Sequence, residues 1–174
     1  MTSKKEKLII VAVVLSCFFF FPFLLSKLDT SSSDLSGESL NTVNTTEDIN
    51  DSSVIKFKAP NGNEISLEVA KSFEKRLRGL MYRTEMDENT GMIFIFEDED
   101  LRTFHMGNTY ISLDMIFLDK DLKVVTIHKN TKVNQSTELY SSSQPAMYVI
   151  EMNAGWADNN AIKIGDIFKS DSSL

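Results

Sequence analysis

The chain has 174 residues, with 18 Lys plus Arg, 25 Asp plus Glu and a single Cys. One Cys excludes an intramolecular disulfide framework, and the net charge of −7 argues against nucleic acid as a partner because phosphate binding requires clustered Lys and Arg. The hydrophobic content of 42% excludes collagen and fully disordered chains. It is, however, an average over three unlike segments, namely residues 1–27, 28–53 and 54–174.

The first segment, residues 1–27, contains a run long enough to cross a membrane. Residues 8–25 hold 16 apolar residues of 18 and follow Lys4, Lys5 and Lys7. At about 1.5 Å per residue the run matches the thickness of the hydrocarbon core, and the preceding lysines orient the N-terminus toward the cytoplasm. We therefore expect an uncleaved signal anchor that exports the rest of the chain to the periplasm or the cell surface of a prokaryotic cell.

Two processed forms of this segment are the alternatives. A cleaved signal peptide would release a secreted protein, but the segment has no A-x-A-like site and its apolar run is longer than a signal peptide requires. A lipoprotein signal would end at Cys17, whereas the apolar run continues to Leu25. The signal anchor fits the length of the run better than either alternative.

Residues 28–53 are expected to form a disordered tether. They contain six acidic residues, no Lys or Arg, and runs of Ser and Thr. Such a stretch buries too little apolar surface to offset the entropy that is lost on ordering it. A flexible linker of this length would hold the domain away from the bilayer by roughly 25 to 30 Å.

The third segment, residues 54–174, has the size of one domain with a single core. It begins with two short strand-like runs, residues 54–58 and 64–69, joined through an Asn-Gly pair at residues 61–62 that is typical of hairpins. A helical period follows and places Phe73, Leu77, Leu80 and Met81 on one apolar face.

Further strands are expected at residues 92–96, 110–118, 122–128, 146–152 and 161–168. The first two are nearly continuous apolar runs, which are typical of strands covered on both faces. Residues 129–145 are expected to form a long loop, which is either functional or mobile. Seven or eight short strands with one helix predict a mainly β domain, either a compact antiparallel barrel or a jelly-roll-like sandwich.

Asp114 is the residue of the domain whose position in the sequence is most informative about function. Strand alternation within residues 111–118 points it, with Ile116 and Leu118, toward a mostly apolar layer. A carboxylate there needs a cation, N–H donors or a proton, and Arg78 and Arg83 are the expected cations. Asp114 is then either a buried brace, which is the commoner role, or a catalytic or ligand-binding group.

Glu151 lies in a comparable position at the end of another apolar run. Asp114 and Glu151 could form a carboxylate pair for acid–base hydrolysis, although no spacing in the sequence brings them together. The sequence contains no nucleophile elbow, phosphate-binding loop, dinucleotide-binding motif or zinc-peptidase motif. The covalent mechanisms that these motifs indicate are therefore unsupported.

His105 and Met106 are weak candidates for a metal site. The two histidines, His105 and His128, lack the short spacing of a zinc site. Seven methionines in an exported domain would suit Cu(I), with His105 and Met106 at its centre. Most of these methionines occupy expected core positions, where Met fills gaps. We therefore expect no cofactor, and keep a Met/His copper site as a minor alternative.

Several separate motifs of the domain point to one family. They are RGLMYR at residues 78–83, GMIFIF at 91–96, FHMGNTYISLDMIFLD at 104–119, YVIE at 148–151, AG at 154–155 and IGD at 164–166. In this order, over about residues 55–169, the chain resembles the bacterial and archaeal domain-of-unknown-function family 192. The resemblance implies a compact, mainly β domain of barrel or jelly-roll type that is often exported. It implies no activity, because none is established for that family.

The chain departs from the family pattern at three positions. His105 stands where the family usually has Trp, Gly107 where it has a basic residue, and Ser112 where it has Pro. If the Trp and the cation contact a ligand in relatives, that contact is altered or lost here. The polar residues that match the family motifs are Arg78, Arg83, Asn108, Thr109, Asp114 and Glu151.

The leading hypothesis is a membrane-anchored extracytoplasmic domain that binds a small polar ligand, such as a glycan or cell-envelope fragment, or that serves as an envelope accessory factor. Its expected pocket lies near Arg78, Arg83, Asn108, Asp114 and Glu151. Carbohydrate binding rests here on analogy with jelly-roll folds alone. An envelope hydrolase that uses the carboxylate pair is the alternative.

Overall fold

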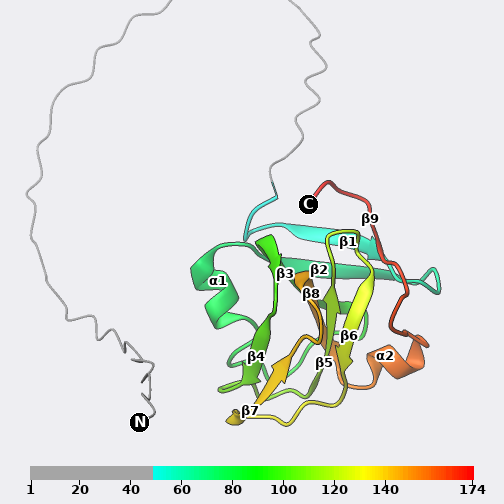
Figure 1. Ribbon diagram of the computed structural model, residues 1–174. Helices are drawn as coiled ribbons and strands as arrows, with labels where there is room; N and C mark the ends of the chain where they lie inside the picture. The colour runs from blue at the N-terminus through cyan, green and yellow to red at the C-terminus, as the bar shows by residue number, and fades with distance from the viewer. Residues whose placement is uncertain (1–48) are drawn as a thin grey trace, which may run out of the picture. The chain divides into compact units, whose positions relative to one another are not determined.

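The computed structural model describes residues 49–174 (Figure 1). The expected membrane anchor and most of the expected tether therefore lie outside the described residues. Within residues 49–174, no helix has the length and apolar character needed to cross a bilayer. Residues 49–53, which the sequence assigns to the tether, pack on the domain: Ile49 contacts the core, and Asp51 accepts hydrogen bonds from the backbone N–H groups of Lys71 and Ser72 at 2.7 and 3.0 Å.

The first hairpin forms where the sequence predicts it. Strands β1 (Val54–Lys58) and β2 (Glu64–Ala70) pair antiparallel. Gly62 in the turn has a φ of 91°, a conformation that glycine adopts without steric strain. Alternate residues of β1, Ile55 and Phe57, are buried, as the period of a half-exposed strand requires.

Helix α1 (Phe73–Arg78) is short, and it does not have the apolar face that the sequence predicts. Ser72 caps its N-terminus by accepting the N–H of Lys75 at 3.1 Å, and Gly79 ends it with a φ of 49°. Leu80 is buried at 2% exposure, but Phe73 and Leu77 are 67% and 63% exposed. The predicted shared apolar face is wrong because the chain turns at Gly79, so that Leu80 enters the core from outside the helix.

The remaining elements build one large sheet and one small one. They are β3 (Thr90–Asp100), β4 (Thr103–Met106), β5 (Leu113–Leu118), β6 (Val124–His128), β7 (Gln135–Ser141), β8 (Ala146–Asn153), α2 (Trp156–Asn159) and β9 (Lys169–Ser170). The large sheet has the order β6-β5-β8-β3-β2-β1-β9, and β4 pairs with β7. All neighbours are antiparallel except β2 and β3, which are parallel. The expectation of a wholly antiparallel sheet is wrong at this pair.

The large sheet curls into a half-barrel, and the C-terminal segment touches both of its ends (Figure 1). The N–H of Val124 donates to the carbonyl of Asp166 at 2.8 Å, and the N–H of Phe168 donates to Leu122 at 3.0 Å. Immediately afterwards β9 pairs with β1. The predicted strand at residues 161–168 is thus reduced to a bridge at Lys123 and Ile167, while the prediction of a mainly β domain is confirmed.

Four elements lie where a loop was predicted or where no element was expected, namely β4, β7, α2 and β9. Strand β7 occupies part of residues 129–145, and only Tyr140 of its seven residues is buried. A strand with so little buried surface lacks the apolar alternation by which strands are predicted. Helix α2 has four residues after Gly155, which is too short to show a helical period.

The core lies on both faces of the large sheet. One cluster contains Ile116, Leu118 and Ile150, and the other contains Met115, Phe117 and Val149. Consecutive residues of β5 and β8 therefore alternate between two apolar layers. This confirms that the continuous apolar runs are strands covered on both faces.

Candidate functional site

Asp114 is fully enclosed and serves as a brace. Its side chain is 0% exposed. One carboxylate oxygen accepts the N–H of Asn130 at 2.9 Å, and the other accepts the N–H of Ala157 in the first turn of α2 at 2.8 Å. Both oxygens are thus satisfied by backbone amides, which tie the chain after β6 and helix α2 to the centre of the sheet.

The arginines expected beside Asp114 lie elsewhere. Arg83 donates to both carboxylate oxygens of Glu68, at 2.5 and 2.6 Å, and lines a polar depression with Glu85 and Asp87. Arg78 is exposed. The expected ion pair with Asp114 is wrong because backbone N–H groups, which a sequence pattern does not show, occupy both of its oxygens.

Asp114 and Glu151 do not form the carboxylate pair that the hydrolase alternative requires. In the pairing of β5 with β8, Asp114 is opposite Met152, and Glu151 is opposite Met115. Since Met152 and Met115 belong to the cores on opposite faces of the sheet, the two carboxyl groups also point to opposite faces. They cannot act on a common substrate.

A cavity of about 390 Å³ opens on the face of the sheet to which Glu151 points. Its walls come from α1 and the turn after it, from β3 and from β4. Leu80 and Phe94 form its buried apolar surface, with the partly buried rings of Phe96 and Phe104 beside them. This volume lies in the range of sites that bind small molecules.

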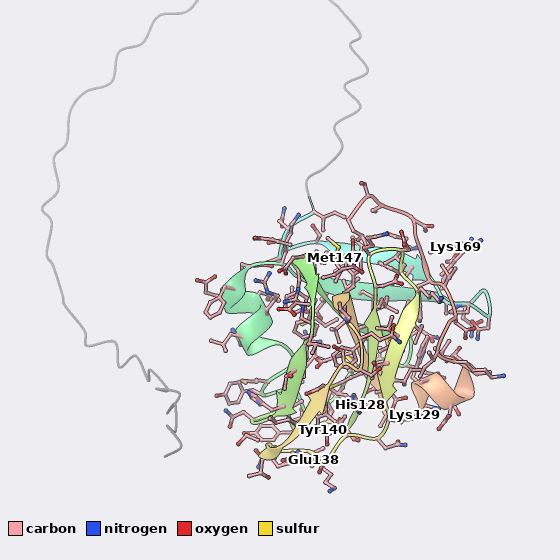
Figure 2. All side chains as sticks on the ribbon, in the orientation of Figure 1. His128, Lys129, Glu138, Tyr140, Met147 and Lys169 are labelled. Atoms are coloured by element: carbon pink, nitrogen blue, oxygen red, sulfur yellow. The ribbon has the colours of Figure 1, made fainter. Side chains whose placement is uncertain are left out.

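Aromatic contacts brace the wall of this cavity. Phe94 and Phe104 meet edge to face at 4.9 Å between ring centroids, and Phe104 meets Phe117 at 5.7 Å. The series continues through His128 to Tyr140 at 5.8 and 5.5 Å, and Figure 2 labels these last two side chains on β6 and β7. Edge-to-face packing of this kind holds the wall of the cavity in a defined shape.

Glu151 lies at the floor of the cavity. It is 4% exposed, and among residues 49–174 no hydrogen bond or ion pair ends on its carboxyl group. No enclosed side-chain oxygen or nitrogen of this part of the chain lacks a hydrogen-bond partner, so the Glu151 oxygens open onto the cavity. Burial raises the pKa of Glu151 from 4.5 to about 8, which keeps the group neutral at pH 7.

Guanidinium groups gather along the walls and the mouth. Arg76 donates to the carbonyl of Ile95 at 3.0 Å and to Lys71. Arg102 donates to the carbonyl of Ala146 at 3.0 Å and pairs with Asp98 at 2.6 Å. The two guanidinium carbons lie 5.0 and 4.1 Å from the centre of the Phe96 ring. Arg78 also lines the cavity.

His105 and Gly107 form a local pair at the mouth of the cavity. The N–H of Gly107 donates to Nδ1 of His105 at 3.0 Å, so the neutral imidazole carries its proton on Nε2. A Cβ at residue 107 would lie 3.1 Å from the same nitrogen. The His105 ring therefore occupies the space beside a residue without a side chain.

The proposed copper ligands do not converge. His105 is exposed, whereas Met106 is 1% exposed and packs in the core. Within residues 49–174, no three side chains of His, Cys, Asp or Glu are grouped so that they could hold a metal ion.

Of the five residues expected to line one pocket, the structure brings together two, Arg78 and Glu151. Asn108 is exposed and has a φ of 57°, and its carbonyl accepts the N–H of Tyr82 at 2.7 Å. Asp114 and Arg83 lie apart from the cavity, as described above.

Sequence reasoning missed Arg76, Arg102 and the aromatic wall. The sequence pattern predicts the phenylalanines to be core residues, because a phenylalanine that lines a cavity occupies the same kind of apolar position in the sequence as one that fills a core. Arg76 and Arg102 belong to no motif, and no signal in the sequence sets them apart from surface cations.

A family model for DUF192, described as "Uncharacterized ACR", matches residues 55–169. A UPF0127 protein of Thermococcus sibiricus is 32% identical over 102 residues, which are 58% of this chain and 62% of that protein. The match thus spans less than two thirds of the relative's length.

Two crystal structures are similar, each with a TM-score of 0.62 over 67% of this chain. One is a Sinorhizobium meliloti 1021 protein described as a candidate transcription regulator, at 32% identity over 92% of its chain. The other is a protein of unknown function from Novosphingobium aromaticivorans DSM 12444, at 33% identity over 83% of its chain.

Proposed function

This chain belongs to the DUF192 family of uncharacterised proteins, and we propose that it is a ligand-binding protein whose site is the cavity between α1, β3 and β4. The ligand is a small anion with an apolar body, and its carboxylate or phosphate group is bound by the guanidinium groups of Arg78 and Arg76. A glycan or cell-envelope fragment that carries such a group is one source of this chemistry.

The observation that carries the proposal is the carboxyl group of Glu151. It is buried, unpartnered within residues 49–174 and open to a cavity. A buried group that must give up its charge destabilises the folded chain relative to a neutral residue of the same shape. Strongly perturbed carboxyl groups in clefts are typical of functional sites.

The charge of the lining selects an anion. Arg76, Arg78 and Arg102 line the cavity, and Glu151 is the single acidic residue among them. Asp98 offsets Arg102, while Arg76 is bonded to neutral carbonyl groups. Because a guanidinium group presents paired N–H donors, it matches carboxylate and phosphate oxygens. The side chains of Leu80, Phe94 and Phe104 offer apolar surface to the body of the ligand.

We further propose that residues 8–25 anchor the protein in a membrane and that the domain lies outside the cytoplasm. The run of 16 apolar residues of 18 after three lysines supports this location. Membrane fractionation of the full chain against a variant that begins at residue 49 tests it. Recovery of the full chain in the soluble fraction would contradict the anchor.

The binding proposal is tested by thermal-shift screening of the full chain in lipid nanodiscs. The probes are small carboxylates, phosphates, acidic oligosaccharides and, for comparison, amines. We expect anions with an apolar body to raise the unfolding temperature, and Arg78→Ala to weaken this response. Arg83→Ala is the matched control, because Arg83 is a nearby arginine, just beyond the turn that follows α1, and pairs with Glu68 instead. Equal responses in the two variants, or shifts with amines alone, would overturn the proposal.

A further inference from the structure

The floor of the cavity differs chemically from its mouth. In the sheet, Glu151 is opposite Met92 of β3 on one side and Met115 of β5 on the other, and both methionines are fully buried. Of the buried residues that line the cavity, Leu80 and Phe94 are apolar, Thr109 carries a hydroxyl group and Glu151 carries the carboxyl group. Any ligand that reaches it leaves water behind, so each polar atom of its inner end must be hydrogen-bonded.

The charged groups around the cavity all lie along its walls and mouth. Arg76 and Arg78 come from α1, Arg102 from the turn before β4, and His105 from β4 itself. None of these groups pairs with Glu151 in the described chain, and Asp114 of the neighbouring strand faces the other side of the sheet.

We propose that the Glu151 carboxyl group donates a hydrogen bond to an acceptor oxygen at the inner end of the ligand. The ligand is then a carboxylate or phosphate whose opposite end carries a carbonyl, ether or hydroxyl oxygen, with an apolar spacer between the two ends. The inference rests on the proposed function, because it assigns the inner end of a ligand whose outer end binds the guanidinium groups.

Protonation of Glu151 supports this assignment. Its pKa of about 8 leaves it neutral at pH 7, and a neutral carboxylic acid has one O–H donor and one carbonyl acceptor. A ligand with a cation at its inner end would instead favour the ionised form of Glu151. Such a ligand would have to move its cation past three guanidinium groups, which repel it because they carry the same charge. A ligand whose inner end carries a neutral acceptor oxygen is therefore the one that matches the protonated carboxyl group of Glu151.

The test compares three ligands that share a benzoate and differ at the opposite end of the ring. 4-Acetylbenzoate carries an acceptor oxygen, 4-isopropylbenzoate has nearly the same shape without it, and 4-(aminomethyl)benzoate carries a cation. Affinities for the full chain in nanodiscs are measured by calorimetry at pH 6.5 and pH 9.5. At pH 6.5 we expect 4-acetylbenzoate to bind about three- to tenfold more tightly than 4-isopropylbenzoate, as one hydrogen bond provides.

Two variants separate the donor from the shape of the site. Glu151→Gln keeps an N–H donor, so the preference for the acetyl group should survive at both pH values. Glu151→Leu removes the donor and should abolish the preference. In the wild-type chain the preference should disappear at pH 9.5, because the carboxyl group ionises above pH 8 and no longer donates.

The outcomes distinguish this inference from the proposed function. If no benzoate binds, the anion site itself is refuted. If the benzoates bind with equal affinity in the wild type and in both variants, the anion site stands and the role of Glu151 is refuted. Tightest binding of 4-(aminomethyl)benzoate, lost in Glu151→Gln, would show that Glu151 acts as a carboxylate and would also overturn the inference.

Discussion

Asp114 and Glu151 lie on adjacent strands of one sheet but face opposite sides of it, because Asp114 is opposite Met152 and Glu151 is opposite Met115. The two acids are buried in different ways. Asp114 is bonded through both oxygens to backbone N–H groups, whereas Glu151 opens onto a cavity without a partner in the described chain. One acid therefore stabilises the fold, and the other is available to a ligand.

Asp114→Asn should destabilise the domain without weakening ligand binding. The amide would present its NH₂ group to one of two backbone N–H donors, leaving a buried donor unpaired. We expect a loss of about 2 to 4 kcal/mol in the free energy of unfolding, measured by urea denaturation. Asp171→Asn, at an exposed position, is the matched control. Equal stability of the two variants would contradict the role of Asp114 as a brace.

Glu151→Gln should remove a pH dependence of stability. The folded pKa of about 8 lies above the unfolded value of 4.5, so between these pH values the folded chain holds a proton that the unfolded chain has released. Stability must then fall as pH rises from 4.5 to about 8, by up to about 1.4 kcal/mol per pH unit. Above pH 8 the loss is complete.

The measurement for Glu151 is the difference in unfolding free energy between variant and wild type. We expect Glu151→Gln to be more stable than the wild type at pH 8.5 and close to it at pH 4.5. The exposed Glu88→Gln serves as the control and should show no such trend. A difference that is independent of pH would mean that Glu151 is not held neutral.

Gly91→Ala should be far more disruptive than Gly107→Ala. A Cβ at residue 91 would overlap the carbonyl oxygen of Glu151 and lie 2.5 Å from the sulfur of Met152, where β3 packs on β8. At residue 107 it would meet the His105 ring, which is exposed and can move. We expect a loss of about 1 to 3 kcal/mol or more at residue 91 and a smaller loss at residue 107, both measured by thermal unfolding. The reverse order would contradict the packing described here.

Leu80→Ala and Leu77→Ala test the corrected helix face. Leu80 is buried in the core, so its truncation should cost about 2 to 5 kcal/mol. Leu77 is exposed on α1, and its truncation should change stability by no more than about 0.5 kcal/mol. Similar losses in urea denaturation would restore the apolar face that the helical period predicts.

Most strands could be predicted because their signals are local. The hairpin of β1 and β2 follows from alternation and an Asn-Gly turn, and the apolar runs of β5 and β8 indicate strands covered on both faces. Strand β7 and helix α2 were missed because one buries a single residue and the other has four residues. The prediction of one apolar helix face was wrong for a related reason. The apolar residues keep a helical spacing beyond Gly79, although the helix itself ends at Arg78.

The sequence by itself determined the two-sided burial of the central strands, the family and the presence of two acids in apolar runs. Only the tertiary structure decided what those acids do. Side-chain alternation tells which neighbours in its own strand point to the same side as a given residue. It does not tell whether Asp114 and Glu151 point to the same face of the sheet, because that depends on the register between β5 and β8, which are far apart in the chain. That register directs Asp114 to backbone donors and Glu151 to a cavity whose guanidinium groups come from α1 and the turn before β4.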